Sequence, residues 1–291
     1  MGLFNQTVLM SDAIHFSTKR PINPYYSDDP LEQKGAIREH EAIAAMFEST
    51  GIKVVRVPSP PSSQDGVYAA NWALVRGNTA ILARLPNVRK AEEAHAEKIL
   101  TDLGKKVIKV PKKYRFSGQG DALPYGNYLF CGTGYRADIE AQAFAAEQLG
   151  YTRIQLQTVP ELDSKKHPVV NKISGWPDSF FYDIDLALAV IRPPENGKKG
   201  LIAYCPEAFT PESQALLTEF KEAEKVHISI EEATIGFAAN LVSTGETVVM
   251  SDKAPKLATA LKQRGLTILT PHIKELAKGG GYIRCTSLSF N

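Results

Sequence analysis

Short strand-like runs alternate with amphipathic helical patterns along the whole chain. Runs rich in apolar and β-branched residues predict strands at residues 7–10, 53–57, 106–110, 127–131, 153–156, 186–191, 200–204, 226–229 and 267–269. Apolar residues spaced three or four apart predict helices at residues 34–47, 91–103, 139–149, 211–220, 231–237 and 255–264. Glycine-containing turns predict two hairpins, at residues 67–82 and 241–250. These elements indicate an α/β protein.

The elements recur in a fixed order. A strand, a hairpin, a helix and a further strand repeat at a spacing of roughly 50 to 60 residues, which gives about five units of the kind that build rings. A chain of 291 residues is long for one hydrophobic core, but closed α/β folds reach this length as a single domain. We therefore expect one domain over residues 1–291. A doubly wound sheet is the alternative, but no GxGxxG run joins a strand to a helix.

Charge and cysteine content exclude several classes of protein. The chain carries 34 Lys and Arg against 32 Asp and Glu, a net charge of +2, and this balance disfavours nucleic-acid binding. Three widely separated cysteines without CxxC spacing indicate neither a disulfide framework nor a metal site, so a reducing cytoplasm fits. No signal-peptide pattern begins the chain, and no apolar run approaches the roughly 20 residues of a membrane span. We expect a soluble cytoplasmic protein.

Cys285 is the candidate nucleophile. It follows three glycines at residues 279–281, in an apolar alternation that predicts a short final strand. Arg284 directly precedes it, and a nearby cation favours the nucleophilic thiolate. The alternative is a small buried side chain without reactivity, a common role of free cysteines.

Five ordered stretches resemble the guanidino-group-modifying superfamily, which includes dimethylarginine dimethylaminohydrolases, arginine deiminases, arginine dihydrolases and glycine amidinotransferases. They are residues 65–75, 116–123, 134–138, 181–185 and 279–288. Together with residues 22–25 they extend the resemblance over essentially the whole chain. The resemblance implies the pentein α/β-propeller, with five pseudo-symmetric ββαβ units around one axis.

The resemblance also implies a chemistry. In this superfamily a cysteine attacks the central carbon of a guanidinium, while oxygen-bearing side chains hold the flat cation. By this similarity Cys285 is the nucleophile, Asp185 and Asn71 bind the substrate nitrogens, and Arg136 binds an amino-acid carboxylate. Further expected substrate contacts are Asn23 and Gln119. No metal and no organic cofactor are implied.

The chain departs from the family pattern at its proton-transfer positions. Asp183 stands where relatives have histidine, and Ser117 and Gln119 replace two acidic residues, which leaves Asp121. An aspartate with an ordinary pKa of about 4 is ionised at neutral pH unless burial or a neighbouring anion raises that pKa. Asp183 and Asp185 are two apart on an expected strand, so they should face one side and raise each other's pKa. Asp183 and Asp121 are therefore the expected catalytic carboxylates.

Another source of an imidazole is His167. It lies in a polar loop, where a solvated side chain is the ordinary expectation. It would reach the site only if the segment 171–179 folds over the pocket.

Two functions from different classes fit these residues. The first is hydrolysis of a small guanidino or ureido compound related to arginine, through a covalent intermediate on Cys285, with amidino transfer as a less favoured reaction. The second is a catalytically impaired family member that binds an arginine-like ligand or has a structural or regulatory role. Loss of the histidine favours the second function, whereas retention of Cys285, Asp185 and Arg136 favours the first. We expect a monomer or a homodimer.

Overall fold

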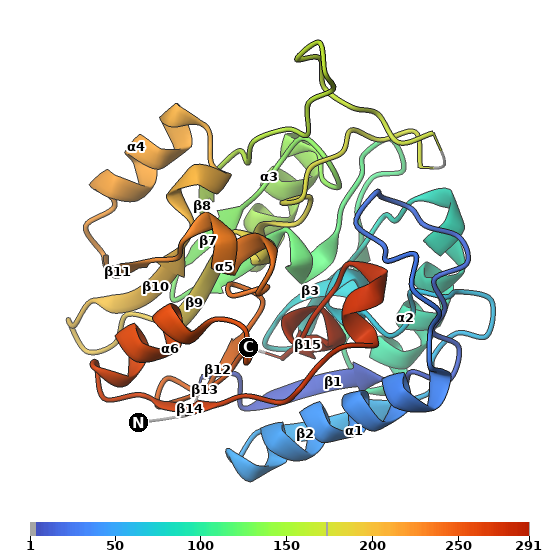
Figure 1. The fold of residues 1–291 in the computed structure, drawn as a ribbon, viewed down its shortest axis with the longest axis horizontal. Coiled ribbons are helices and arrows are strands. Elements are labelled where there is room, and N and C mark those ends of the chain that lie inside the picture. Colours follow the sequence, from blue (N-terminus) through green and yellow to red (C-terminus); the bar gives the residue numbers. More distant parts are fainter. Residues whose placement is uncertain (1–3, 173, 291) are drawn as a thin grey trace.

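Five three-stranded sheets surround a common centre in the computed structural model, which describes residues 4–172 and 174–290 (Figure 1). The sheets are β3 (Ala73–Arg76), β4 (Thr79–Leu82) and β5 (Lys106–Lys109); β6 (Ala122–Tyr125), β7 (Tyr128–Cys131) and β8 (Thr152–Gln155); β9 (Leu188–Arg192), β10 (Gly200–Tyr204) and β11 (Ala223–His227); β12 (Val242–Ser243), β13 (Thr247–Val249) and β14 (Thr267–Leu269); and β15 (Ser287–Ser289), β1 (Thr7–Ser11) and β2 (Lys53–Val57). Each middle strand pairs antiparallel with one neighbour and parallel with the other. The fifth sheet brings the two ends of the chain together, because β15 pairs with β1.

A helix connects the two parallel strands of every sheet, as a parallel crossover requires. These helices are α1 (Gln33–Ser49), α2 (Lys90–Asp102), α3 (Ile139–Leu149), α4 (Pro211–Glu219) and α6 (Pro255–Lys262). Each repeat is thus a ββαβ unit. The five units predicted from the sequence are confirmed.

Helix α3 illustrates how the sequence produces these layers. Ala141, Ala145 and Leu149 are buried at intervals of four residues, so they form one stripe that packs on Leu129 of the underlying sheet. Gly150 follows with φ 67°, a left-handed conformation that ends a helix and favours glycine. The predicted helix therefore ends where its apolar stripe ends.

A turn of 3-10 helix precedes the first strand of four units, so β3 and β9 begin later than the strands that the sequence predicted. These turns are η1 (Ala69–Trp72), η3 (Gly118–Gly120), η4 (Ile184–Leu186) and η7 (Arg284–Thr286). Asp185 lies on η4 and Cys285 on η7, so the expectation that Asp183 and Asp185 share a strand is wrong. Because η1 contacts both η3 and η7, the turns bring polar side chains together, whereas a strand would alternate them between two faces.

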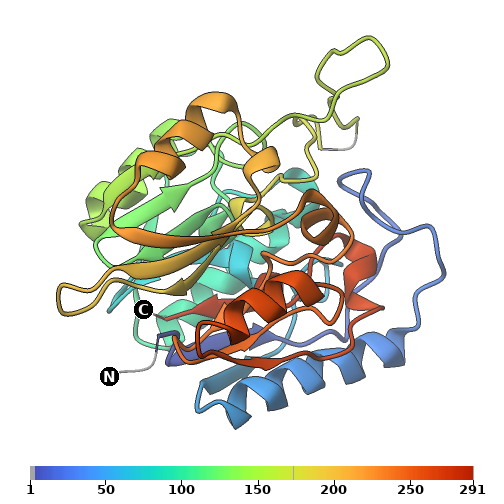
Figure 2. The same ribbon diagram turned by 60° about the vertical axis from the view of Figure 1, so that its left-hand side comes forward.

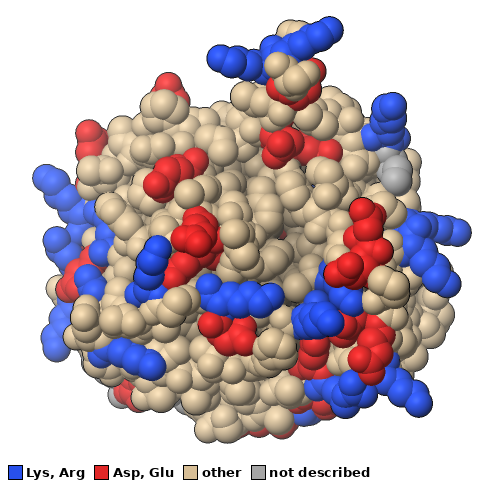
Figure 3. Space-filling view, viewed as in Figure 1, with Lys and Arg blue, Asp and Glu red and all other residues tan. Residues whose placement is uncertain are grey.

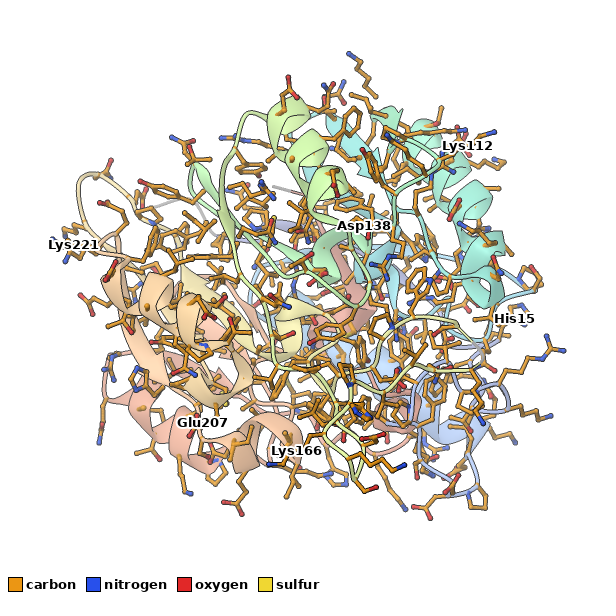
Figure 4. The ribbon with its side chains drawn as sticks, turned by 90° about the horizontal axis from the view of Figure 1, so that it is seen from above. His15, Lys112, Asp138, Lys166, Glu207 and Lys221 are labelled. Atoms are coloured by element: carbon orange, nitrogen blue, oxygen red, sulfur yellow. The ribbon has the colours of Figure 1, made fainter. Side chains whose placement is uncertain are left out.

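The connection between β8 and β9 projects from the molecule as a narrow arm (Figures 1 and 2). Bridges join Leu162 to Pro168 and Val170 to Pro177. Lys166 lies on this arm, which Figure 4 shows from above. The arm thus carries the loop in which His167 was considered as an imidazole source.

The molecular surface mixes charges of both signs. Figure 3 shows Lys and Arg side chains interspersed with Asp and Glu around a hollow near the centre of one face. In the part of the chain that is described, no helix combines the length and the apolar character needed to cross a membrane.

Candidate active site

Cys285 is held at the centre of the fold by Asn240. The short helix α5 (Ile230–Thr234) ends before the predicted residue 237, and Phe237 then turns the chain with φ 50°. This turn places Oδ1 of Asn240 3.1 Å from the backbone N of Cys285 and Nδ2 3.1 Å from its Sγ. The thiol also lies 3.7 Å from Oδ2 of Asp185. The sulfur therefore contacts one amide and one carboxyl group.

The glycine run lets the segment that carries Cys285 pack flat on an aromatic ring. The hydroxyl of Tyr68 donates to the carbonyl of Leu276 at 2.6 Å. A Cβ added at Gly281 would overlap the Tyr68 ring. Glycine is therefore required here for close approach to Tyr68.

Burial and the Asp185 carboxylate raise the pKa of the Cys285 thiol well above its usual range. Arg284, expected to favour the thiolate, interacts with the Cys285 charge and donates hydrogen bonds to Oε1 of Gln119 at 3.1 Å and to Oγ of Ser289 at 3.1 Å. The Gln119 amide also pairs with the backbone N and O of Ser289. Arg284 and Gln119 thus tie the last strand to η3.

Asp183 accepts hydrogen bonds at both carboxylate oxygens. The hydroxyl of Ser117 donates to Oδ1 at 2.7 Å, and Nδ2 of Asn71 donates to Oδ2 at 2.8 Å. Two donors stabilise the ionised form of a carboxylate. Asp183 is therefore arranged as an anion and not as a proton donor.

The orientation of the Asn71 amide follows from a buried arginine. Nη1 of Arg89 lies 2.9 Å from Oδ1 of Asn71, and a guanidinium only donates. Arg89 in turn forms a two-pronged ion pair with Glu92, at 2.8 and 2.7 Å. Glu92 also accepts from the Trp72 indole at 3.0 Å, so Trp72 supports this ion pair.

Three buried carboxyl groups, Asp121, Asp183 and Asp185, share the centre of the site. Burial raises the pKa of all three, and the Asp183 charge raises the pKa of Asp121 and Asp185 further, to well above the ordinary range. For Asp183 the rise is opposed by Arg136 and by the hydrogen bonds from Ser117 and Asn71. Oδ2 of Asp121 and Oδ1 of Asp185 are buried without a hydrogen-bond partner among the described residues. The cluster therefore holds protons unless a cation occupies it.

A cavity of about 10 Å³ adjoins Cys285, which is space for roughly one water molecule. Five of the predicted site residues line it together: Asn23, Asn71, Arg136, Asp183 and Cys285. The guanidinium of Arg136 lies over the Tyr182 ring, 4.5 Å from its centroid. A ligand of the size of arginine needs this cavity to open.

Three predicted site residues do not line this cavity. Asp185 lines a second cavity, of about 20 Å³, together with Asn5 and Arg284. Asp121 is joined to η4, because its Oδ1 accepts the backbone N–H of Ile184 at 3.0 Å. Gln119 is not among the residues that line the cavity beside Cys285; its amide binds the last strand instead.

No histidine lines the cavity beside Cys285 among the described residues. The side chain of His167 is 73% exposed and lies 3.7 Å from Asp163 on the arm. The hypothesis that His167 supplies the missing imidazole is therefore not supported. In the described ranges no group of three or more His, Cys, Asp or Glu side chains is placed to hold a metal ion.

Sequence reasoning missed Asn240, Arg89, Tyr26 and Asp65. The hydroxyl of Tyr26 donates to Oδ1 of Asp65 at 2.5 Å, and both residues line the cavity with Arg89. For Asn240 a signal exists: an aromatic residue followed by Ala-Ala-Asn occurs at residues 68–71 and again at 237–240. Comparing the units with one another would have identified Asn240 as the equivalent of Asn71.

The family model for eukaryotic N,N dimethylarginine dimethylhydrolases matches residues 23–174, just over half of the chain. The chain is 27% identical over 285 residues to the N(G),N(G)-dimethylarginine dimethylaminohydrolase of Mycobacterium tuberculosis, covering 97% of this chain and 85% of that protein. It is 26% identical over 286 residues to the bifunctional arginine dihydrolase/ornithine cyclodeaminase AgrE of Nostoc sp., covering 96% of this chain. It spans only 37% of AgrE.

Among solved structures, the chain is similar to the N-terminal domain of ArgZ, an arginine dihydrolase from cyanobacteria, determined in complex with its product. The TM-score is 0.84 at 22% identity, and the match covers 98% of this chain and 97% of that domain. The five-unit α/β-propeller fold predicted from the sequence is therefore confirmed.

Proposed function

Because the chain belongs to the N,N dimethylarginine dimethylhydrolase family, we propose that it hydrolyses a C–N bond of a small guanidino or ureido compound related to arginine, through a covalent intermediate on Cys285. The observation that carries this proposal is the contact of Sγ with Asp185 beside the Asp183 carboxylate. The carboxylate oxygens can bind a planar guanidinium cation, and the neighbouring sulfur can then attack the central carbon of that cation.

Binding of the cation activates the sulfur. A guanidinium placed among Asp183, Asp185 and Cys285 offsets the charge repulsion that raises the pKa of the thiol, so the thiol proton moves to Asp185. The thiolate then adds to the central carbon. Asp185 returns its proton to the leaving amine, and a cationic thiouronium remains on Cys285. Water adds to this thiouronium and the C–S bond breaks, which gives a ureido product. Of the two protons lost in this step, one returns to the sulfur to restore the Cys285 thiol and the other is released.

This scheme changes four roles expected from the sequence. Asp183 serves as the anion that binds the cation, because both its oxygens accept hydrogen bonds. Asp185 transfers the proton, because its carboxyl lies nearest to the sulfur. Asn71 orients Asp183 instead of binding substrate through its oxygen, which Arg89 engages. Asp121 adds a third carboxyl group to the cluster that attracts the cation. Arg136 and Asn23 line the cavity and face the rest of the substrate.

A second function has one observation in its favour. The described cavity lining contains no imidazole, so proton transfer to the leaving group lacks its usual donor. A cavity lining of this kind is expected in a protein that binds an arginine-like cation and turns it over slowly or not at all.

Intact mass measurement separates the two functions. The protein is incubated with a panel of guanidines, among them arginine, methylated arginines and agmatine, and with 2-chloroacetamidine as a trapping reagent. An adduct that is lost in Cys285→Ser, together with an amine and a ureido product, supports the hydrolase. Ligand-induced stabilisation without adduct or product would support the binding function.

We also propose that residues 1–291 act as one domain, as a monomer or homodimer in the cytoplasm, without nucleic-acid or membrane partners. The single ring of five sheets and the nearly even charge support this. Transfer of the amidino group to a second amine in place of water is the remaining alternative reaction.

A further inference from the structure

Asn240 holds the segment that carries Cys285 through both its backbone and its side chain. Its carbonyl accepts the N–H of Arg284 at 3.4 Å, and its Oδ1 accepts the N–H of Cys285 at 3.1 Å. The residue is fully buried. Two successive peptide N–H groups of η7 are thus bound by a single residue from the neighbouring unit.

The contact of the Asn240 side chain with the Cys285 N–H fixes the orientation of the amide group. That orientation identifies which amide atom contacts the sulfur. A backbone N–H only donates, so the amide atom that faces the N of Cys285 is the oxygen. The nitrogen of the same amide then points at Sγ, 3.1 Å away. The amide donates to the sulfur, and the sulfur accepts.

A donor to sulfur stabilises the thiolate more than the thiol. This matters here because Asp185 and Asp183 both oppose ionisation of Cys285, and the hydrogen bonds of Arg284 go to Gln119 and Ser289 and not to the sulfur. The Asn240 amide is a neutral group, so it favours the thiolate without competing with a cationic substrate for the carboxylates.

We propose that Asn240 is a catalytic residue that donates a hydrogen bond to the Cys285 thiolate and fixes the direction in which the sulfur attacks. The inference rests on the proposed role of Cys285 as nucleophile. It adds a residue from the fourth unit to a site otherwise formed by the first, second, third and fifth.

The test measures the rate of Cys285 carbamidomethylation by iodoacetamide as a function of pH, read from the mass of the peptide that contains Cys285. Two variants are compared with the wild type. Asn240→Asp keeps an oxygen acceptor for the Cys285 N–H but removes the donor to sulfur. Asn240→Leu removes both contacts in a side chain of similar size. Leu257→Ala, which opens the buried face of α6, controls for loss of stability.

If Asn240 donates to the thiolate, the midpoint of the alkylation profile rises by about one pH unit or more in both Asn240 variants, and alkylation at neutral pH slows about tenfold. Leu257→Ala lowers the melting temperature and leaves the midpoint unchanged. If Asn240 only clamps the backbone, the neutral variant Asn240→Leu lowers the melting temperature but keeps the wild-type midpoint, and that result overturns the proposal. Alkylation requires no turnover, so a shifted midpoint without any guanidine adduct would leave the Asn240 inference standing and reject the proposed hydrolase.

Discussion

Nη1 of Arg89 lies 2.9 Å from Oδ1 of Asn71, and this contact decides which end of the Asn71 amide faces Asp183. Arginine cannot accept a hydrogen bond, so the amide nitrogen is directed to the carboxylate. The buried ion pair between Arg89 and Glu92 therefore orients a donor to Asp183, which adds to the effect of Arg136 and Ser117 in opposing the rise of the Asp183 pKa on burial. Stability and site chemistry are linked through this chain of contacts.

Asn71→Leu should lower the free energy of unfolding by about 2 kcal/mol or more, because it leaves Arg89 and Asp183 each short of a buried partner. Asn127 provides a matched control: its Oδ1 accepts from Arg76 at the same 2.9 Å, but at an exposed position. Asn127→Leu should cost about 0.5 kcal/mol or less. Urea unfolding measures both values, and equal losses in the two variants would contradict the linkage.

Gly120→Ala should disable the site with little effect on the backbone. A Cβ at Gly120 would overlap Nδ2 of Asn71 and Oδ2 of Asp183, so the two side chains must separate. Overpacking of this kind costs about 1–3 kcal/mol. We expect loss of the guanidine-induced rise in melting temperature.

Gly104→Ala is the control for glycine replacement itself. Gly104 has φ 78° and open space around it, so its variant carries backbone strain and leaves the site untouched. The ligand response should therefore persist in Gly104→Ala, and a response that also persists in Gly120→Ala would contradict the steric argument.

The stability of the ligand-free protein should fall as the pH rises. Burial and the Asp183 charge raise the folded-state pKa of Asp121 and Asp185. An acid with a raised folded pKa contributes stability that is complete below its unfolded pKa, about 4, and is lost as the pH rises through the folded pKa. Melting temperatures between pH 5 and 9 should therefore decrease.

Asp121→Asn should flatten that dependence, because the amide keeps an oxygen for the N–H of Ile184 and has no proton to lose. A saturating guanidinium ligand should stabilise the wild type more at high pH than at low pH. A wild-type melting temperature that rises across this range would show that the cluster is ionised throughout.

The sequence identified more of the fold than of the site's geometry. The hydrophobic pattern predicted about five repeating units, because each helix and strand buries its own apolar stripe, as Ala141, Ala145 and Leu149 do; the ββαβ arrangement within each unit came from the family resemblance. The same hydrophobic pattern predicted strands at Asp185 and Cys285, which lie on 3-10 turns. A turn of three residues is too short to produce a hydrophobic period of its own. Asn240 was not predicted, because Cys285, which it contacts, lies 45 residues further along the chain. Only the closed ring of units brings these two residues together.

Tyr26→Phe should open the cavity. The Tyr26 hydroxyl donates to Asp65 at 2.5 Å, and burial raises the pKa of Asp65 to about 6. Without this bond the loop before α1 loses a contact with the segment before η1. We expect iodoacetamide to modify Cys285 several-fold faster at fixed pH, whereas Tyr151→Phe, at a cavity beside Arg76, should leave the rate unchanged. Slower modification in Tyr26→Phe would contradict a closing role.

Asp183→His should convert a slow enzyme into a faster one. The variant places an imidazole beside Cys285, and a general acid–base group contributes roughly 10² to 10⁴ in rate. The ring nitrogen that faces Asn71 accepts from Nδ2, which leaves the other nitrogen for proton transfer. When reactions are quenched at timed intervals and the intact protein mass is measured, the thiouronium adduct should accumulate in the wild type. In the variant it should disappear as the ureido product forms. Asp183→Asn, which removes the charge without adding a base, should form less adduct than the wild type and no ureido product; equal adduct in Asp183→Asn and the wild type would show that Asp183 does not bind the cation.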